Sequence, residues 1–204
     1  MKTAIQIGVA NGDDFVKEFI LNNKDYYIYL IEPVEASIPL IENSYSFTEN
    51  KTIWNFAISK TNGYLTFYTD INEGGNNQVA SIYKNHLMAH QRTLEQIKEQ
   101  IVPCLDLNTL INFVIKNNEI EYLFIDTEGH DCDILLSTDF SKLNIKNIIF
   151  ETAHSEGALT SGGQKLIETT KHLELNKYKS DPDSLFKNFK SFNWNGNIHF
   201  TKNP

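Results

Sequence analysis

The 204-residue sequence lacks the features that mark several common classes of protein. Its two cysteines, Cys104 and Cys132, form no CxxC motif, so we predict reduced thiols, a cytoplasmic location and no cysteine-based zinc site. No apolar run is long enough to span a bilayer, and the N-terminus, MKTAIQIG, has neither the apolar stretch nor the cleavage site of a signal peptide. No block is rich in lysine and arginine and the net charge is −8, so nucleic acid is not an expected partner.

What the sequence does contain is enough apolar material for one core. Hydrophobic residues make up 41% of the chain and aromatic residues 12%, which is typical of a folded protein and not of a disordered one. No internal repeat, low-complexity segment or linker divides the chain. We therefore predict a single domain over residues 1–204.

Short apolar segments alternate with segments of helical periodicity along most of the chain. Buried strands are predicted at residues 4–9, 25–32, 51–59, 120–129 and 144–151. A further strand at 61–70 is predicted to pair in antiparallel fashion, and two last strands are expected near 175–180 and 193–202. Helices are predicted at residues 13–23, 34–45, 106–118, 130–140 and 162–175. This alternation predicts a doubly wound α/β domain, in which ligands bind at the carboxyl ends of parallel strands.

A glycine-containing turn follows the first predicted strand, and a glutamate ends the second. The turn from Gly8 to Gly12 lets the backbone approach a ligand closely, although a purely structural turn is the alternative. Its spacing is not the GxGxxG of dinucleotide-binding proteins. Glu32 comes about 20 residues later, where α/β nucleotide-binding folds hold ribose hydroxyls. We interpret Glu32 as a ribose clamp, with a solvated acid at the strand end as the alternative.

Acidic residues also end two later strands. Asp126 and Glu128 share one side in extended geometry, and Glu151 ends the adjacent strand, with His154 close behind. Asp126 and Glu151 could therefore face each other and hold a divalent cation such as Mg²⁺ or Mn²⁺. Without a metal, His154 or His130 is the expected base, because an ordinary carboxylate is a weak one.

Two other groups of titratable residues are expected to be peripheral. Asp131 and Asp133 lie on the next predicted helix and should be solvated. His86 and His90 are four residues apart and share one face if their segment is helical. No glutamate follows His86 directly, so the HExxH zinc motif is absent. A surface or acceptor-site role is favoured over a metal site for these histidines.

Six segments resemble, in order and spacing, the FkbM-type methyltransferases: IGVANGDD, IEP, NFAIS, VPCLDLNTL, LFIDTEGHDCDIL and IIFE. The resemblance runs from residue 4 to residue 152, and FIDTEGHD is its most specific part. Members of this family are S-adenosylmethionine-dependent O-methyltransferases with the class I Rossmann-like fold. The resemblance therefore implies a mostly parallel seven-stranded methyltransferase sheet with a C-terminal antiparallel strand.

The resemblance also implies roles for individual residues. The glycine turn would surround the methionine moiety of the cofactor, the end of the second strand would hold the ribose, and the residues after position 54 would lie near the adenine. The implied cofactor-binding residues are Gln6, Gly8, Asn11, Gly12, Glu32, Pro33, Asn55, Ala57 and Asp126. Gln6 stands where many members have aspartate, and it can still hydrogen-bond the cofactor's amino group without adding charge.

The activity implied is methylation of a hydroxyl group on a carbohydrate or another small hydroxylated acceptor, with Asp126, Glu128 and His154 as candidate catalytic residues. A non-catalytic S-adenosylmethionine-binding module of a glycan-assembly protein is one alternative. A nicotinamide-dependent oxidoreductase is another, disfavoured because GxGxxG is absent. The chain begins almost at its first strand, whereas many methyltransferases have a helix before it. It is therefore a candidate piece of a longer chain, fused to or associated with glycosyltransferase domains.

Overall fold

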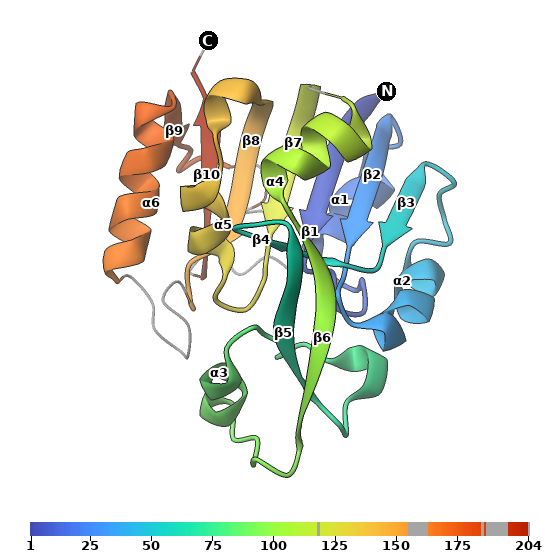
Figure 1. Ribbon diagram of the computed structural model, residues 1–204. Helices are drawn as coiled ribbons and strands as arrows, with labels where there is room; N and C mark the ends of the chain where they lie inside the picture. The colour runs from blue at the N-terminus through green and yellow to red at the C-terminus, as the bar shows by residue number, and fades with distance from the viewer. Residues whose placement is uncertain (118, 155–162, 185, 187–195, 204) are drawn as a thin grey trace.

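The computed structural model describes residues 1–117, 119–154, 163–184, 186 and 196–203. A seven-stranded sheet with the order β3-β2-β1-β7-β8-β10-β9 forms its centre, and a smaller sheet has the order β4-β6-β5 (Figure 1). In the large sheet β10 runs antiparallel to both of its neighbours, while the pairs among β3, β2, β1, β7 and β8 are all parallel. The predicted doubly wound, mostly parallel Rossmann-like sheet with an antiparallel C-terminal strand is confirmed.

The first half of the large sheet follows the predicted alternation of strands and helices. Its elements are β1 (Lys2–Ile7), α1 (Phe15–Asn22), β2 (Tyr26–Ile31), η1 (Glu35–Ser37), α2 (Ile38–Ser44) and β3 (Lys51–Trp54). The Asp14 carboxylate accepts hydrogen bonds from the backbone N–H groups of Val16 and Lys17 at the start of α1. Because an N-cap side chain satisfies donors that the helix leaves free, α1 begins at this residue, as predicted.

The second half extends the sheet on the other side of β1. Its elements are β7 (Glu119–Ile125), α5 (Asp131–Ser137), η4 (Phe140–Lys142), β8 (Asn144–Glu151), α6 (Gln164–Leu175), β9 (Tyr178–Ser180) and β10 (Asn197–Lys202). The strand order reverses between β1 and β7, which pair directly from Ala4 to Ile7. A reversal of this kind opens a crevice at the carboxyl ends of the two strands.

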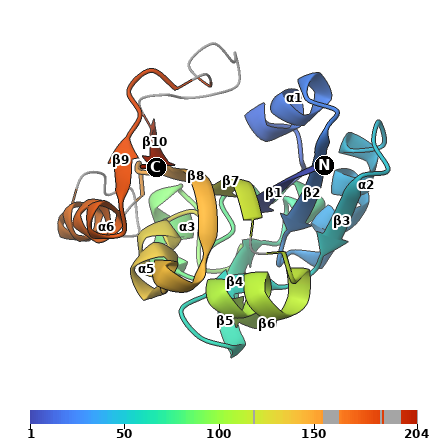
Figure 2. The same ribbon diagram turned by 90° about the horizontal axis from the view of Figure 1, so that it is seen from above.

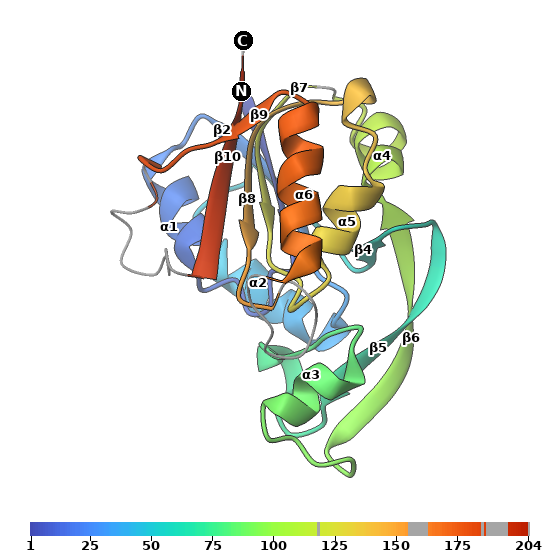
Figure 3. The ribbon, with the colours of Figure 1, turned by 90° about the vertical axis from the view of Figure 1, so that its left-hand side faces the viewer.

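Between the two halves the chain forms the small sheet, which the sequence did not predict. The elements of this part are β4 (Ala57–Ser59), β5 (Gly63–Asp70), η2 (Gly74–Asn76), α3 (Lys84–Ala89), β6 (Ile97–Asp106), α4 (Leu107–Thr109) and the π-helical turn η3 (Leu110–Ile115). The predicted antiparallel pairing of residues 61–70 is confirmed, with β6 as the partner. Figures 1 and 3 place β5, β6 and α3 beyond the carboxyl ends of the large sheet's strands.

The prediction of a single strand at residues 51–59 is wrong, because two strands in different sheets occupy this segment. The chain leaves the large sheet after Trp54 and joins the small one at Ala57. Asn55 lies at the break, and its side-chain amide donates hydrogen bonds to the carbonyl oxygens of Glu32 (2.9 Å) and Pro33 (3.1 Å). These bonds fix the turn that ends β3 and carries the chain across to β4.

Helices cover both faces of the large sheet, which gives three layers (Figure 2). One apolar core lies under α1 and α2 and includes Phe19 and Tyr45. The other lies under α4, α5 and α6 and includes Leu110, Leu135 and Leu173. Both cysteines are free and buried. Among the described residues, no helix has the length and apolar character needed to cross a membrane.

Candidate active site

A cavity of about 260 Å³ lies where the carboxyl ends of β1, β2 and β7 meet the small sheet. The sequence-predicted residues that line it are Gly8, Asn11, Glu32, Pro33, Ala57, Asp126, Glu128 and His130. The predicted residues Gln6, Gly12, Asn55, Glu151 and His154 lie outside its lining. The edge of the sheet on which the ligand was expected is therefore the edge that carries the cavity.

Gly8, directly after β1, lies against the backbone of Asp126 at the end of β7. Its φ is +78°, and a Cβ atom at this position would lie 1.7 Å from the carbonyl oxygen of Asp126. Only glycine combines this left-handed conformation with such a close backbone approach. Gly12 also has a positive φ, +73°, but it packs against Ser44 and Tyr45 behind the cavity. The turn thus presents its first glycine, and not its second, to the cavity.

Gln6 points to the other side of the turn. Its amide donates a hydrogen bond to the Asp14 carboxylate (2.5 Å), and its carbonyl oxygen accepts one from the Tyr45 hydroxyl (3.2 Å). Asp14 itself lines the cavity, and burial raises the pKa of its carboxyl above the ordinary value. In the sequence Asp14 falls within the helix predicted over residues 13–23, and its position directly after the glycine turn is the signal that could have placed it beside the ligand.

Glu32 is buried, with 4% of its surface exposed, so the alternative of a solvated strand-end acid is wrong. Its carboxylate accepts hydrogen bonds from the backbone N–H groups of Val9 (3.0 Å), Ala10 (2.8 Å) and Val34 (2.8 Å). Burial raises the pKa of Glu32 to about 7 against the opposing effect of these three bonds. Because a carboxylate accepts about four hydrogen bonds, one acceptor position remains for a ligand.

Three carboxyl groups gather at the ends of β7 and β8. Oxygen atoms of Asp126, Glu128 and Glu151 all lie within 4.8 Å of one another. Burial, followed by the neighbouring acids, raises the pKa of Glu128 to about 8 and of Glu151 to about 10. Asp126 lines the cavity and its surface is exposed there. The surrounding protein, followed by Glu128, Asp131 and Asp14, raises the pKa of its carboxyl above the usual value. The predicted approach of Asp126 to Glu151 is therefore present, with Glu128 as a third member.

The expectation that Asp131 and Asp133 are solvated is wrong. Both side chains are buried. Asp131 accepts hydrogen bonds from the backbone N–H and hydroxyl of Thr127. Asp133 accepts from the Tyr83 hydroxyl (2.7 Å) and the Lys165 ammonium (2.8 Å), and these and other bonds lower its pKa against the opposing effect of burial. Asp131 therefore holds the loop after β7, and Asp133 joins α5 to Tyr83 and Lys165.

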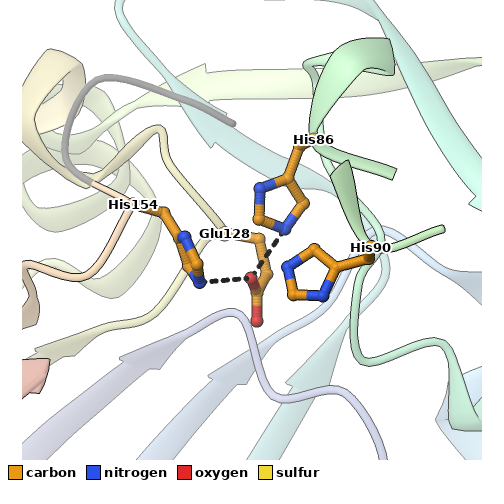
Figure 4. Close-up of side chains that lie close together, drawn as sticks. All are labelled: His86, His90, Glu128 and His154. Carbon is orange, nitrogen blue, oxygen red and sulfur yellow. Dashed lines mark ion pairs between the residues drawn. The ribbon is translucent and has the colours of Figure 1, made fainter. Parts of the chain in front are cut away.

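The histidines lie deeper than the sequence suggested. His130 is buried beside Ser59, 3.1 Å from its hydroxyl, and it lines the cavity. His86 is fully buried, so a surface role for it is wrong, and both it and His90 turn toward Glu128 and His154 (Figure 4). Burial lowers the pKa of His154 to about 4, with help from the two neighbouring histidines. This four-residue group was not predicted, because it joins three segments that are distant in the sequence.

Comparison with known proteins identifies one family. Residues 6–180 match the family profile described as the methyltransferase FkbM domain. A search of curated proteins found no match.

Several solved structures are similar to this chain at low sequence identity. The Methanococcus jannaschii fibrillarin pre-rRNA processing protein is 11% identical, with a TM-score of 0.48, over 98% of this chain and 64% of that chain. TrmK of M. capricolum, in complex with S-adenosyl-homocysteine, is 14% identical, with a TM-score of 0.47, over 99% of this chain and 62% of that chain. The aminoglycoside resistance methyltransferase NpmB1 is 10% identical, with a TM-score of 0.46, over 99% and 87%. This chain thus spans less than two thirds of the length of the first two.

Proposed function

The chain belongs to the family of FkbM-type methyltransferases, and we propose that it transfers a methyl group from S-adenosylmethionine to a hydroxyl group of a sugar or another small hydroxylated acceptor. The observation that carries this proposal is the convergence of Gly8, Glu32 and Asp126 on one cavity. Each follows a different parallel strand, and such strand ends, beside a reversal of strand order, are where α/β sheets bind ligands.

The residues around the cavity fit S-adenosylmethionine. Gly8 leaves room for a ligand to lie against the backbone of the turn, and Glu32 keeps one acceptor position for a ribose hydroxyl. Asp14 supplies a carboxylate next to Gln6, where a cationic amino group of the cofactor would be stabilised. Pro33, Ala57 and their apolar neighbours form the side of the cavity that suits an adenine ring.

The lining also favours a neutral, hydroxylated acceptor. It contains the carboxyl groups of Asp126 and Glu128, which accept hydrogen bonds from hydroxyls, and the apolar rings of Phe56 and Phe67, on which a sugar can pack. None of the described residues that line the cavity is lysine or arginine. An anionic acceptor would therefore meet negative groups without a compensating cation.

S-adenosylmethionine supplies a methyl group already activated on a sulfonium, so the protein's own work is to align the acceptor oxygen and remove its proton. Asp126 and Glu128 are suited to the second task, because both line the cavity and their pKa values are raised above those of ordinary carboxyl groups. His154 is less suited, since its pKa is about 4 and it lies outside the cavity lining. We therefore place the base among the carboxyl groups.

Binding and turnover test the proposal separately. Calorimetry should show binding of S-adenosylmethionine and none of NAD⁺. Incubation with neutral mono- and oligosaccharides should then release S-adenosylhomocysteine only when a suitable acceptor is present. Binding without turnover on any hydroxylated acceptor would favour a non-catalytic module, and binding of NAD⁺ in place of S-adenosylmethionine would overturn the proposal.

Replacing Glu32 with glutamine should weaken binding of S-adenosylmethionine by more than about tenfold. A charge-assisted hydrogen bond contributes about 1.5–3 kcal/mol, and about 1.4 kcal/mol corresponds to a factor of ten. The NH₂ group of the new amide would also face a backbone N–H group that now donates a hydrogen bond to the carboxylate, so two donors would meet. Calorimetry measures the affinity, and circular dichroism checks the fold.

The matched control is Glu35→Gln, which changes an exposed glutamate three residues away in the same way. It should leave the affinity unchanged. Equal affinities of the Glu32→Gln variant and the unmodified protein would remove Glu32 from the cofactor site.

A further inference from the structure

Three histidines and one glutamate from separate segments converge at the edge of the cavity (Figure 4). His86 and His90 come from α3 and its C-terminal cap, Glu128 from the loop after β7, and His154 from the loop after β8. One nitrogen or oxygen atom of each lies within 4.8 Å of the corresponding atoms of the others. The chain has six histidines in all, so half of them meet at this point.

The side chains are packed closely without forming ordinary hydrogen bonds. His86 Nε2 lies 2.9 Å and His154 Nε2 3.7 Å from Glu128 Oε2. The ring centre of His86 lies 4.6 Å from the ring centre of His90 and 4.8 Å from that of His154. Within the described part of the chain, both ring nitrogens of His86 and the Oε2 atom of Glu128 are buried and have no partner with hydrogen-bond geometry.

Buried polar atoms without partners are rare in folded proteins, and each one weakens the fold. Here the buried atoms without hydrogen-bond partners lie close together, and His86 has no exposed surface. What the four side chains share is that each places one nitrogen or oxygen donor atom within 4.8 Å of the donor atoms of the others. Such an arrangement is stabilised by a cation that accepts a lone pair from each of these atoms at once.

We propose that His86, His90, Glu128 and His154 bind one divalent transition-metal ion of the zinc type. Imidazole nitrogen suits Zn²⁺ and its neighbours in the first transition series, whereas Mg²⁺ prefers six oxygen ligands. Three imidazoles and one carboxylate supply the four donors that a tetrahedral zinc site requires. The site shares only Glu128 with the three-carboxylate group, and it does not depend on the proposed methyl transfer.

The backbone supports this role for Glu128. Its φ is +53°, a left-handed conformation that is uncommon for residues other than glycine, and the next residue, Gly129, has a φ of +106°. The Ser81 hydroxyl donates a 2.8 Å hydrogen bond to the Glu128 carbonyl oxygen and holds the loop in place. The loop therefore turns the carboxylate toward the histidines. A bound ion would join α3 to the ends of β7 and β8 and fix one wall of the cavity.

Titration with Zn²⁺ alone tests the inference. The full chain is prepared without a polyhistidine tag, treated with a chelator, and titrated in a calorimeter. We expect one Zn²⁺ ion per chain, a rise in melting temperature on binding, and no competition from Mg²⁺. Substitution by Co²⁺ should give the visible absorption bands of a tetrahedral site.

Variants locate the ion. His90→Gln and Glu128→Gln should each weaken Zn²⁺ binding by at least about 100-fold, because losing even an indirect supporting partner of a metal ligand costs roughly 10–100-fold. His90 is only partly buried, so its replacement disturbs packing less than that of His86. His172→Ala is the matched control, because His172 lies on α6 and bonds to the Thr138 carbonyl oxygen. Absence of Zn²⁺ binding, or loss in the control equal to that in the cluster variants, would overturn the inference.

Discussion

Gly8→Ala is expected to destabilise the fold by more than about 4 kcal/mol and to abolish binding of S-adenosylmethionine. The new Cβ atom would lie 1.7 Å from the Asp126 carbonyl oxygen, in a backbone conformation with a φ of +78°. No rotamer relieves this overlap, so β1 and the end of β7 must separate, although backbone hydrogen bonds pair them up to Ile7. The same movement displaces Asp126 from the cavity floor. Urea unfolding measures the stability, and calorimetry measures the binding.

Gly74→Ala separates the steric overlap from the cost of the backbone conformation. Gly74 has a φ of +52°, and a Cβ atom there meets nothing within 4 Å. This variant should lose only about 1–2 kcal/mol, the usual cost of a left-handed conformation for a residue with a side chain. If both variants lose the same amount, the close approach at Gly8 is not what fixes the two strand ends together.

The centre of the large sheet could be predicted because β1, β2 and β7 are buried along most of their length. Such strands are short, continuous apolar runs, which stand out from the helical segments between them. The predicted strand at residues 144–151 has the observed bounds of β8, and the helix predicted over residues 13–23 is present as α1, with Asp14 as its N-cap. Both signals are local, so the sequence alone was sufficient to identify them.

The small sheet could not be predicted because its pairing depends on contacts between distant segments. Gly63 pairs with Cys104, and Asp70 pairs with Ile97 across the same ladder. The strands are partly exposed, so neither shows the continuous apolar pattern that revealed the large sheet. The apolar run at residues 51–59 also concealed the break at Asn55, where the chain passes from one sheet to the other.

The candidate site was predicted only in part, because some of its residues are placed by contacts between distant segments. Carboxylates at strand ends are placed by the fold itself, so Glu32 and Asp126 could be assigned to the cavity edge. Burial of Asp133 depends on Tyr83 and Lys165, which come from other segments, and no local pattern indicates these partners. The spacing of His86 and His90 was a usable signal, but their partners became apparent only in three dimensions.

Glu128 belongs to both clusters: the three-carboxylate group of Asp126, Glu128 and Glu151, and the group that it forms with the three histidines. A cation held by the histidines would engage its carboxylate and keep it from acting as a base. Asp126 has no histidine among the residues grouped with it and faces the cavity directly. Of the acids near the proposed reaction centre, Asp126 is therefore the one whose replacement should affect turnover most.

Asp126→Asn is expected to lower the rate of methyl transfer by about 100-fold or more, which is the usual cost of losing a general base. An asparagine has nearly the same shape but cannot take a proton from the acceptor hydroxyl. The raised pKa of Asp126, caused by the surrounding protein and then by Glu128, Asp131 and Asp14, makes the original carboxylate a stronger base than an ordinary one. Binding of S-adenosylmethionine should largely survive, because the variant retains Gly8 and Glu32, the residues proposed to bind it. Turnover at saturating cofactor, together with calorimetry, measures the two effects separately.

Asp13→Asn is the matched control, because Asp13 also lines the cavity and is exposed, but its carboxylate pairs with Lys17 and does not belong to the three-carboxylate group. Its loss removes a carboxylate from the same cavity and should leave the rate unchanged.

Chelation then separates the roles open to Asp126. Recovery of a chelated enzyme with Mg²⁺ or Mn²⁺ would indicate a cation between Asp126 and Glu151, recovery with Zn²⁺ would indicate the histidine group, and no effect of the chelator would leave Asp126 acting directly. Near-normal turnover of the Asp126→Asn variant would contradict each of these roles and place the base elsewhere in the cavity.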